Sequence, residues 1–305
     1  MEMIMFDEAI SRIAKILVSN NIKHEPIHFL HKSNNLLFGD NVNVFIKVAL
    51  GTPETNGNLE TELLFYTNYS EKLNLMSPLI PTVELLNIGN EPYQFIVMPW
   101  RNFILIEDTK NLELNHIEEL MIQLNHIHQL PILGGFIVNS AEKLHQRFDY
   151  RLALSNKFHP SQYHVDIAKE LVNAFFVDEP FNRSKGVIVH GDSHTGNIVK
   201  DIENGKYLWV DFESSLVAPR EWDIGTLKLN FLHIHQEQNI WEGSLKVLEL
   251  NGSIDYELVE SFLIIKAILA TTFRMSLPDR QELFQKQVEA LKPLLDGKPF
   301  PRLFF

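Results

Sequence analysis

The chain has 305 residues, of which 45% are hydrophobic and 22% are charged, and its formal net charge is -12. This composition is typical of a soluble globular protein with one large core or two modest ones. The acidic balance argues against nucleic acid as a partner, because affinity for a polyanion depends on Lys and Arg. It is compatible with a cationic small substrate, and equally with an acidic protein that has no such substrate.

The chain contains no cysteine, which excludes disulfides, thiolate nucleophiles and cysteine-based zinc sites. The N-terminus carries Glu2, Asp7 and Glu8 and lacks the basic region of a signal peptide. The apolar run over residues 262–270 is interrupted by Lys266 and is too short to span a membrane. We therefore expect a cytoplasmic protein with no membrane partner.

The first hundred residues predict a small, strand-rich lobe. Apolar residues with helical periodicity predict a helix over 7–19, and a second helix is predicted over 59–73. Apolar runs bounded by turn-forming residues predict five strands of one sheet. These runs cover residues 27–30, 36–38, 42–50, 83–86 and 93–98.

From residue 112 onward the chain is mainly helical. Apolar residues at a 3.6-residue period predict a buried amphipathic helix over 114–130. Further helices are predicted over residues 141–152, 161–176, 222–235, 240–250, 256–275 and 279–295. The predicted fold class is therefore α+β, with an N-terminal lobe over 1–98 and a C-terminal helical lobe over 99–305.

A polar loop between two apolar runs has the spacing of a kinase catalytic loop. His190, Asp192 and Asn197 form the pattern H-x-D-x-x-x-x-N. In kinases the Asp of this pattern accepts the substrate proton and the Asn binds Mg²⁺. Gly191 stands where protein kinases have Arg.

The residues after this loop predict a β-hairpin. Asn204-Gly205 favours a two-residue type I′ turn. With these two residues as the turn, Glu203 pairs with Lys206, and Asn197 pairs with Phe212.

This pairing places Asn197 and Asp211 on adjacent strands at one end of the hairpin. Directly opposed residues lie about 5 Å apart, a separation that two ligands of one metal ion can span. Asp211-Phe-Glu213 then corresponds to the Asp-Phe-Gly segment of kinases, whose Asp holds Mg²⁺. Glu213 replaces the Gly.

Three segments in this order resemble the aminoglycoside phosphotransferase family, namely His190–Asn197, Val210–Phe212 and Pro219-Arg-Glu-Trp-Asp223. That family also takes in kinases of choline, homoserine, methylthioribose and macrolides. The resemblance implies a protein-kinase-like two-lobe fold with a small antiparallel sheet in the N-terminal lobe. It also implies an ATP- and Mg²⁺-dependent kinase that phosphorylates a hydroxyl group of a small molecule.

The resemblance assigns Lys47, at the end of the strand segment Val44-Phe-Ile-Lys47, to the nucleotide phosphates. A lysine in an apolar strand needs a partner, because burying an ammonium group alone is costly. The family segment that supplies the partner carboxylate corresponds to Glu62, with Glu60 as the competing candidate. The alternative for Lys47 is an edge-strand lysine that points to solvent.

Further nucleotide contacts are implied by the same resemblance. Ser33 and Asn35 belong to a Ser-Asn-type loop in the place where protein kinases cover the phosphates with a glycine-rich loop. Met98 falls in the segment that joins the lobes, where the backbone binds adenine. An ordinary polar turn and a plain core residue remain the structural alternatives at these positions.

For the chemistry, the resemblance implies that Asp192 orients the acceptor hydroxyl, while Asn197 and Asp211 hold Mg²⁺. Asp223 is predicted either to cap a helix or to hold the backbone of the catalytic loop. His190 is predicted to position the loop rather than to transfer a proton.

Two other functions remain open from the sequence. His190, Asp192 and His194 could bind the metal of a hydrolase, because imidazole and carboxylate are ligands of zinc and iron. The chain could also be a nucleotide-binding pseudokinase that acts as a sensor. For a kinase, an aminoglycoside-like molecule, an amino alcohol and a sugar all remain possible acceptors.

Overall fold

The computed structural model describes residues 2–32, 35–49, 59–88, 91–106, 112–302 and 304. The chain divides into two compact units. Unit 1 consists of Met1–Ile104, Lys200–Lys206 and Asp211–Ser215, and unit 2 of Leu105–Val199, Tyr207–Val210 and Leu216–Phe305. The lobe boundary between residues 98 and 99 stays a prediction, and unit 1 includes short segments from beyond it.

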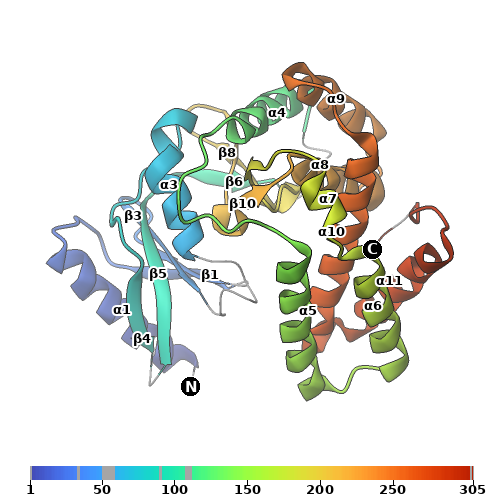
Figure 1. The fold of residues 1–305 in the computed structure, drawn as a ribbon. Helices are drawn as coiled ribbons and strands as arrows, with labels where there is room; N and C mark the ends of the chain where they lie inside the picture. The colour runs from blue at the N-terminus through green and yellow to red at the C-terminus, as the bar shows by residue number, and fades with distance from the viewer. Residues whose placement is uncertain are drawn as a thin grey trace. The chain divides into compact units, whose positions relative to one another are not determined.

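Unit 1 contains the predicted five-stranded antiparallel sheet, in the order β1-β2-β3-β5-β4 (Figure 1). The strands are β1 (His28–Lys32), β2 (Asn35–Gly39), β3 (Val44–Ala49), β4 (Glu84–Ile88) and β5 (Glu91–Pro99). Strand β3 is central, and its Lys47 pairs with Leu37 of β2 and with Ile96 of β5. Lys47 is buried, so the alternative of a solvent-facing edge lysine is wrong.

Two helices of unit 1 are α1 (Glu2–Ser19) and α3 (Leu59–Leu73). Helix α1 buries Ala9, Ile13 and Leu17, four residues apart and hence on one face, in a core shared with Ile46 and Val48 of the sheet. Strand side chains alternate between the two faces of a sheet, so Lys47, which lies between Ile46 and Val48, projects to the face opposite α1.

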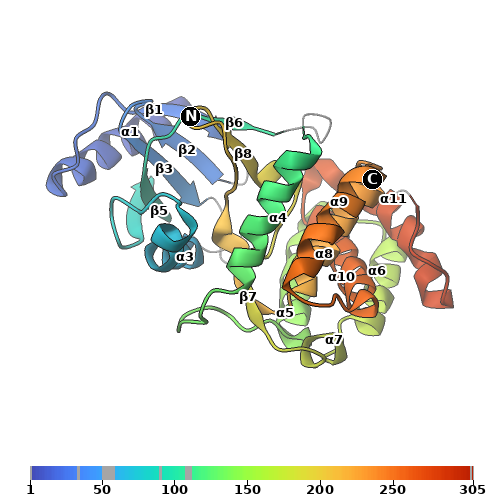
Figure 2. The same cartoon turned by 90° about the horizontal axis from the view of Figure 1, so that it is seen from above.

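Unit 2 is mainly helical, and α4 lies beside α9 in both views (Figures 1 and 2). Its helices are α4 (Leu114–His128), α5 (Ala141–Ser155), α6 (Gln162–Phe175), α7 (Glu179–Asn182), α8 (Glu221–Lys228), α9 (Gln238–Leu248), α10 (Tyr256–Met275) and α11 (Gln281–Leu291). The main core gathers around α10, which contacts α5, α6, α8 and α11. The sequence predicted seven of these eight helices, α8 as part of a longer one, and did not predict the four-residue α7.

Short elements complete the described structure. Three strands are β7 (Val187–Val189), β10 (Leu216–Ala218), which pairs antiparallel with β7, and β6 (Phe103–Leu105). Strands β8 (Ile198–Asp201) and β9 (Tyr207–Trp209) belong to the hairpin after the catalytic loop. The 3-10 turns are η2 (Asn156–Phe158), η3 (Thr195–Asn197), η4 (Phe212–Ser214), η6 (Glu249–Asn251), η7 (Pro278–Arg280) and η8 (Lys292–Asp296).

The helix predicted over 222–235 changes its winding halfway. Helix α8 ends at Lys228, and a π-helical turn, η5 (Leu229–Ile234), follows it. The side-chain oxygen of Asn230 in this turn accepts a hydrogen bond from the amide of Thr195 at 3.2 Å. Such π turns often occur at functional sites, and here the turn supports the loop that contains Asn197.

The hairpin register differs from the prediction by two residues. The amide of Asp201 donates to the carbonyl of Lys206 at 2.8 Å, and the amide of Val210 donates to the carbonyl of Asn197 at 3.0 Å. Asn197 therefore faces Val210 and not Phe212.

The reason for this shift is a four-residue turn over 202–205. The buried carboxylate of Asp201 accepts hydrogen bonds from the Glu203 amide and the Asn204 side chain, both at 2.9 Å. Only Gly205 of the Asn204-Gly205 pair has a positive φ, at 71°, whereas a type I′ turn needs both. An aspartate that binds the backbone two residues ahead is itself a turn-forming feature.

Across the described part of the chain, no helix combines the length and apolar character needed to cross a membrane.

Candidate active site

In unit 1, the ammonium group of Lys47 is paired with the carboxylate of Glu62. The Nζ atom lies 2.8 Å from Oε2 of Glu62, and both side chains are buried. Glu60 is exposed, and its Oε1 accepts a hydrogen bond from Gln94 at 3.2 Å. The prediction that Glu62 rather than Glu60 is the partner of Lys47 is confirmed. Positions two apart on a helix face different directions, so only one of the two glutamates turns toward the lysine.

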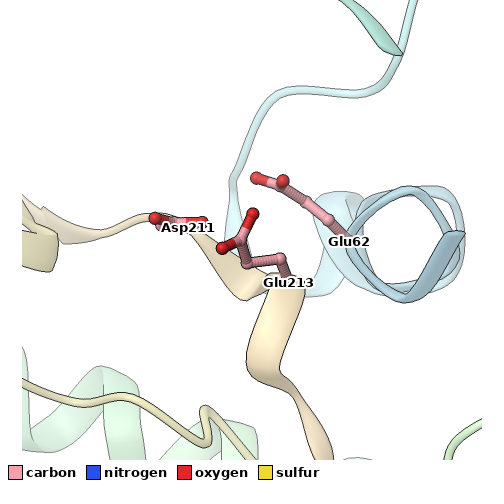
Figure 3. A group of neighbouring side chains, drawn as sticks. All are labelled: Glu62, Asp211 and Glu213. Carbon is pink, nitrogen blue, oxygen red and sulfur yellow. The ribbon is translucent and has the colours of Figure 1, made fainter. Parts of the chain in front are cut away.

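Two further carboxylates reach the same ammonium group. Lys47 Nζ lies 2.6 Å from Oδ1 of Asp211 and 2.8 Å from Oε2 of Glu213. One helix supplies Glu62, while Asp211 and Glu213 come from one short segment of the chain (Figure 3). The structure thus brings Lys47 and Glu62 together with Asp211, one of the two predicted Mg²⁺ ligands, and adds Glu213.

The backbone holds Asp211 in an unusual conformation, with φ 67° and ψ 62°. A non-glycine residue in this left-handed region costs about 1–3 kcal/mol and persists only when its surroundings impose it. Here the Lys47 contact and the next side chain impose it. The ring of Phe212 stacks on Phe65 at a centroid distance of 3.8 Å and meets the edge of Tyr66.

The charges in this cluster are unbalanced, because three carboxylates surround one ammonium group. Burial opposes the charge on Lys47, but the attraction of Glu62, Asp211 and Glu213 outweighs it and raises the lysine pKa well above its ordinary value. Burial raises the pKa of Glu213 to about 7, against the attraction of Lys47 and with the repulsion of Asp211 and Glu62. Burial likewise raises the pKa of Glu62. The cluster is therefore electrostatically suited to receive another cation.

The donor atoms of this cluster suit magnesium. One carboxylate oxygen from each of Glu62, Asp211 and Glu213 lies within 4.8 Å of the others. Carboxylate oxygens are the ligands that Mg²⁺ prefers, usually one or two of them together with substrate phosphates. Because the carboxylates outnumber the ammonium group, a divalent cation would relieve their mutual repulsion.

Of the other predicted nucleotide residues, Asn35 is linked to this cluster. Its side-chain amide donates to Oε2 of Glu213 at 3.2 Å, and its Oδ1 atom is buried without a hydrogen-bond partner among the described residues. Met98 is buried in β5, opposite Phe45 of β3. Ser33 lies outside the described residues. The nucleotide roles of all three stay predictions.

In unit 2, Asp223 organises the catalytic loop. Its carboxylate accepts hydrogen bonds from the amides of His190 and Gly191, at 2.8 and 2.9 Å. Its pKa is lowered although burial opposes the charge, because His128 donates to it and both His190 and Lys266 interact with it. Helix α8 begins before Asp223, at Glu221. Of the two predicted roles, holding the loop backbone is therefore the one that the contacts support.

The proposed catalytic carboxylate, Asp192, is half exposed, with 47% of its side chain accessible. Its Oδ2 lies 3.3 Å from Nε2 of His194. Desolvation opposes the charge, but His194, Lys266 and His190 outweigh it and hold the pKa of Asp192 well below its ordinary value. Asp192 is consequently an anion at neutral pH, the form in which a carboxylate can act as a general base.

Asn197 and His190 are fixed by the loop itself. The side-chain nitrogen of Asn197 donates to the carbonyl of Asp192 at 2.8 Å, so a cation would be bound through the amide oxygen. Nε2 of His190 lies 3.0 Å from the carbonyl of Val210, and Nδ1 accepts from the amide of Asp192 at 3.3 Å. Both ring nitrogens of His190 are thus used for positioning, which argues against a metal-ligand role.

Sequence reasoning missed several residues that support this loop. Lys266 donates to the carbonyl of Gly191, and Nε1 of Trp222 donates to the same carbonyl at 3.2 Å. The sequence did contain one indication, since Lys266 interrupts an otherwise apolar helix. Neither Trp222 nor Asn230 could be distinguished from an ordinary core residue by its sequence context.

Comparisons with solved structures identify the fold, although the sequence matches no curated protein. An amicoumacin kinase, hAmiN, in complex with AMP-PNP, Ca²⁺ and Ami, is 12% identical with a TM-score of 0.70, over 99% of this chain and 98% of that one. The choline kinase LicA from Streptococcus pneumoniae is 14% identical with a TM-score of 0.64, over 94% and 99%. A microcompartment-associated aminopropanol kinase is 13% identical with a TM-score of 0.62, over 94% and 96%.

The predicted fold class is confirmed: the chain has the protein-kinase-like fold, with a small antiparallel sheet and a mainly helical remainder. A family model described as phosphotransferase enzyme family, APH, matches residues 65–242. This segment covers more than half of the chain and includes the catalytic loop, the Asp211–Glu213 segment and Asp223. The chain therefore belongs to the phosphotransferase enzyme family.

Proposed function

We propose that this enzyme transfers the γ-phosphoryl group of ATP to a hydroxyl group of a small molecule, with Mg²⁺ as the metal. The observation that supports this most directly is the buried Lys47, bonded to both Glu62 and Asp211. A kinase requires both the lysine–glutamate pair and the metal-binding aspartate to be in place for transfer.

We assign the roles in unit 1 as follows. Lys47 binds the phosphates of ATP, and Glu62 holds the lysine in place. Asn35 and Met98 contact the nucleotide, together with Ser33. Asp211 is a ligand of Mg²⁺, which offsets the charge on the phosphate oxygens when it is bound.

In unit 2, we assign Asp192 to the acceptor and Asn197 to Mg²⁺. Asp192 accepts the hydrogen bond of the acceptor hydroxyl and orients its oxygen toward the phosphorus atom. Most of the rate enhancement then comes from positioning and electrostatics. The half-exposed carboxylate of Asp192, held by a loop with a fixed backbone, suits this task.

The acceptor is defined by its hydroxyl group. The similar solved structures include kinases named for amicoumacin, choline and aminopropanol. The net charge of -12 is compatible with a cationic acceptor. Close to Asp192, however, Arg147 and Lys266 add positive charge. We therefore propose a small hydroxylated molecule in the cytoplasm without fixing its charge.

A metal-dependent hydrolase is the less favoured alternative. It requires His190 as a ligand, and both nitrogens of that ring already bind the backbone. It also leaves Lys47 and its three carboxylate partners without a role.

The test of the proposed function is a screen of hydroxylated metabolites and antibiotics for ATP consumption that depends on Mg²⁺. A kinase is expected to give a phosphorylated product and to lose activity in EDTA. A pseudokinase would bind ATP without forming product. Transfer that continues undiminished in EDTA would contradict the magnesium assignment.

Replacing Lys47 with Ala is expected to weaken ATP binding much more than adenosine binding, because only ATP has phosphates to pair with the ammonium group. The loss should depend little on salt, since a buried ion pair is poorly screened. Calorimetric titration of both ligands into both proteins measures the difference.

The control is Lys15→Ala, which changes an exposed lysine of α1 in the same unit. It should alter ATP affinity by less than about 0.5 kcal/mol. Because Lys47 also compensates buried carboxylates, unfolding must be measured in parallel. Equal losses for ATP and adenosine would indicate damage to the fold, and no loss for either would remove Lys47 from the phosphate site.

A further inference from the structure

Lys266 lies in the middle of α10, among apolar residues, and only 8% of the residue is exposed. Burying an ammonium group in such surroundings is costly unless it is compensated. Two contacts compensate it. Nζ donates a hydrogen bond to the carbonyl of Gly191, and it lies 4.2 Å from the centre of the Trp222 ring, a favourable cation–π distance.

The carbonyl that Lys266 binds belongs to the peptide group immediately before Asp192. Nε1 of Trp222 donates to the same oxygen at 3.2 Å. At the other end of this planar group, the amide of Asp192 donates to Nδ1 of His190 at 3.3 Å. The plane of the peptide is therefore held on both sides, and this plane sets the direction in which the Asp192 side chain leaves the backbone.

Gly191 makes this arrangement possible. Its φ of 87° lies in the left-handed region, which glycine adopts without steric cost. Its amide donates to Asp223 while its carbonyl accepts from Lys266 and Trp222. Both polar groups of the Gly191 backbone are thus hydrogen-bonded to residues of helices α8 and α10. Protein kinases have an arginine at the position of Gly191 in the catalytic loop.

The charges around Lys266 connect it with the same loop. Burial lowers the pKa of Lys266 to about 8, while Asp192 and Asp223 partly offset this and Arg147 adds to it. His128 and His190 also interact with Asp223. A proton on Lys266 is therefore held weakly enough to be lost at moderately alkaline pH.

We propose that Lys266 is a positioning residue for phosphate transfer, whose ammonium group fixes the Gly191–Asp192 peptide plane and thereby the direction of the Asp192 carboxylate. This inference rests on the proposed function. It is distinct from the nucleotide role, because Lys266 and its partners lie within unit 2, whereas the residues assigned to the nucleotide lie in unit 1.

The kinetic test compares Lys266→Met and Lys266→Arg with the wild type. Lys266→Met keeps the length and apolar stem but loses the charge and the donor. It is expected to lower kcat by about 10- to 100-fold, the cost of a small misplacement of a reacting group. The KM for ATP should change by less than about 3-fold, since Gly191 and Trp222, the partners of Lys266, have no nucleotide role.

The matched control is Lys246→Met, an exposed lysine on α9, which should keep wild-type kinetics. Lys266→Arg keeps the charge, so it should retain more activity than Lys266→Met. If Lys266→Met keeps kcat within 2-fold of the wild type, the positioning role is wrong.

The pH profile separates positioning from simple packing. Wild-type kcat is expected to fall as pH rises through about 8, where Lys266 loses its proton. This alkaline decline should be absent from Lys266→Met, and it should move to higher pH in Lys266→Arg. A decline that is identical in all three proteins would show that another group causes it.

Stability should change in the opposite direction over this range. A lysine in the unfolded chain keeps its proton to a pKa of 10.5, whereas the folded state releases it near 8. The unfolded state then binds more protons between these values, so this group makes the folded protein more stable as pH rises. Lost activity in that window therefore cannot be attributed to unfolding through Lys266.

A measurement that needs no acceptor completes the test. In wild-type protein labelled with ¹⁵N, the amide signals of Asp192 and Gly191 are expected to titrate with a midpoint near pH 8, and in Lys266→Met they should not. An equal titration in both proteins would overturn the inference. If the amides titrate as expected but no acceptor is phosphorylated, the proposed function fails while the contact between Lys266 and the loop stands.

Discussion

Asp192→Asn is expected to lower phosphate transfer by at least about 100-fold, within the range for a group that handles the transferred proton. The substitution keeps the shape of the side chain and removes its charge. The wild-type carboxylate is kept ionised by His194, Lys266 and His190. An amide cannot accept the proton of the acceptor hydroxyl, so the hydroxyl oxygen is no longer activated.

Nucleotide binding should survive this substitution, because the residues assigned to the phosphates belong to unit 1, whereas Asp192 belongs to unit 2. The measurements are product formation by mass spectrometry and ATP affinity by calorimetry. Asp296→Asn, which changes an exposed aspartate in the same unit, is the matched control and should be silent. Wild-type turnover by Asp192→Asn would remove Asp192 from the mechanism.

Asp211→Asn should have the largest effect, with transfer reduced on the order of 10³-fold, as when a preorganised charged group at a reaction centre is lost. The structure favours Asn over Ala for this test. Asp211 has a φ of 67°, and asparagine tolerates the left-handed region better than most residues. The backbone should therefore keep its conformation while the negative charge disappears.

Glu62 and Glu213 remain beside Lys47 after this substitution, but burial raises the pKa of both carboxyl groups, so neither readily supplies the missing charge. We expect the Mg²⁺ concentration for half-maximal transfer to rise, and transfer by Asn197→Ala to fall less severely. The control Glu60→Gln removes an exposed carboxylate from α3 and should leave the Mg²⁺ requirement unchanged. An unaltered requirement in Asp211→Asn would show that the metal is held elsewhere.

The partner of Lys47 illustrates how far sequence reasoning extends. The apolar run around the lysine indicated that it needs a partner, and the segment after it offered Glu60 and Glu62. Which of them turns toward the strand depends on how α3 packs, and only Glu62 is buried there. Glu213 joins them from a position more than 150 residues further along the chain, and no local pattern could predict that contact.

The hairpin shows a different limitation. Two apolar runs on either side of a turn predicted that the hairpin exists. Its register depended on whether Asn204-Gly205 or Asp201 sets the length of the turn. Asn204-Gly205 favoured a two-residue turn, whereas the buried Asp201 stabilises a four-residue one. Oδ2 of Asp201 lies 3.2 Å from Nη1 of Arg101. The burial of Asp201 therefore depends on the tertiary structure and not on the local sequence.

The sequence by itself determined the class of the fold, most of its helices, the five-stranded sheet and the catalytic loop. These features depend on periodicity and on short motifs, which local residues encode. Only the tertiary structure decided which charges meet. Lys47 forms ion pairs with three carboxylates, and Lys266 donates to the carbonyl of Gly191, 75 residues away in sequence. The physical reason is that a buried charge is stable only where distant segments supply its partners, and the chain's packing decides which segments those are.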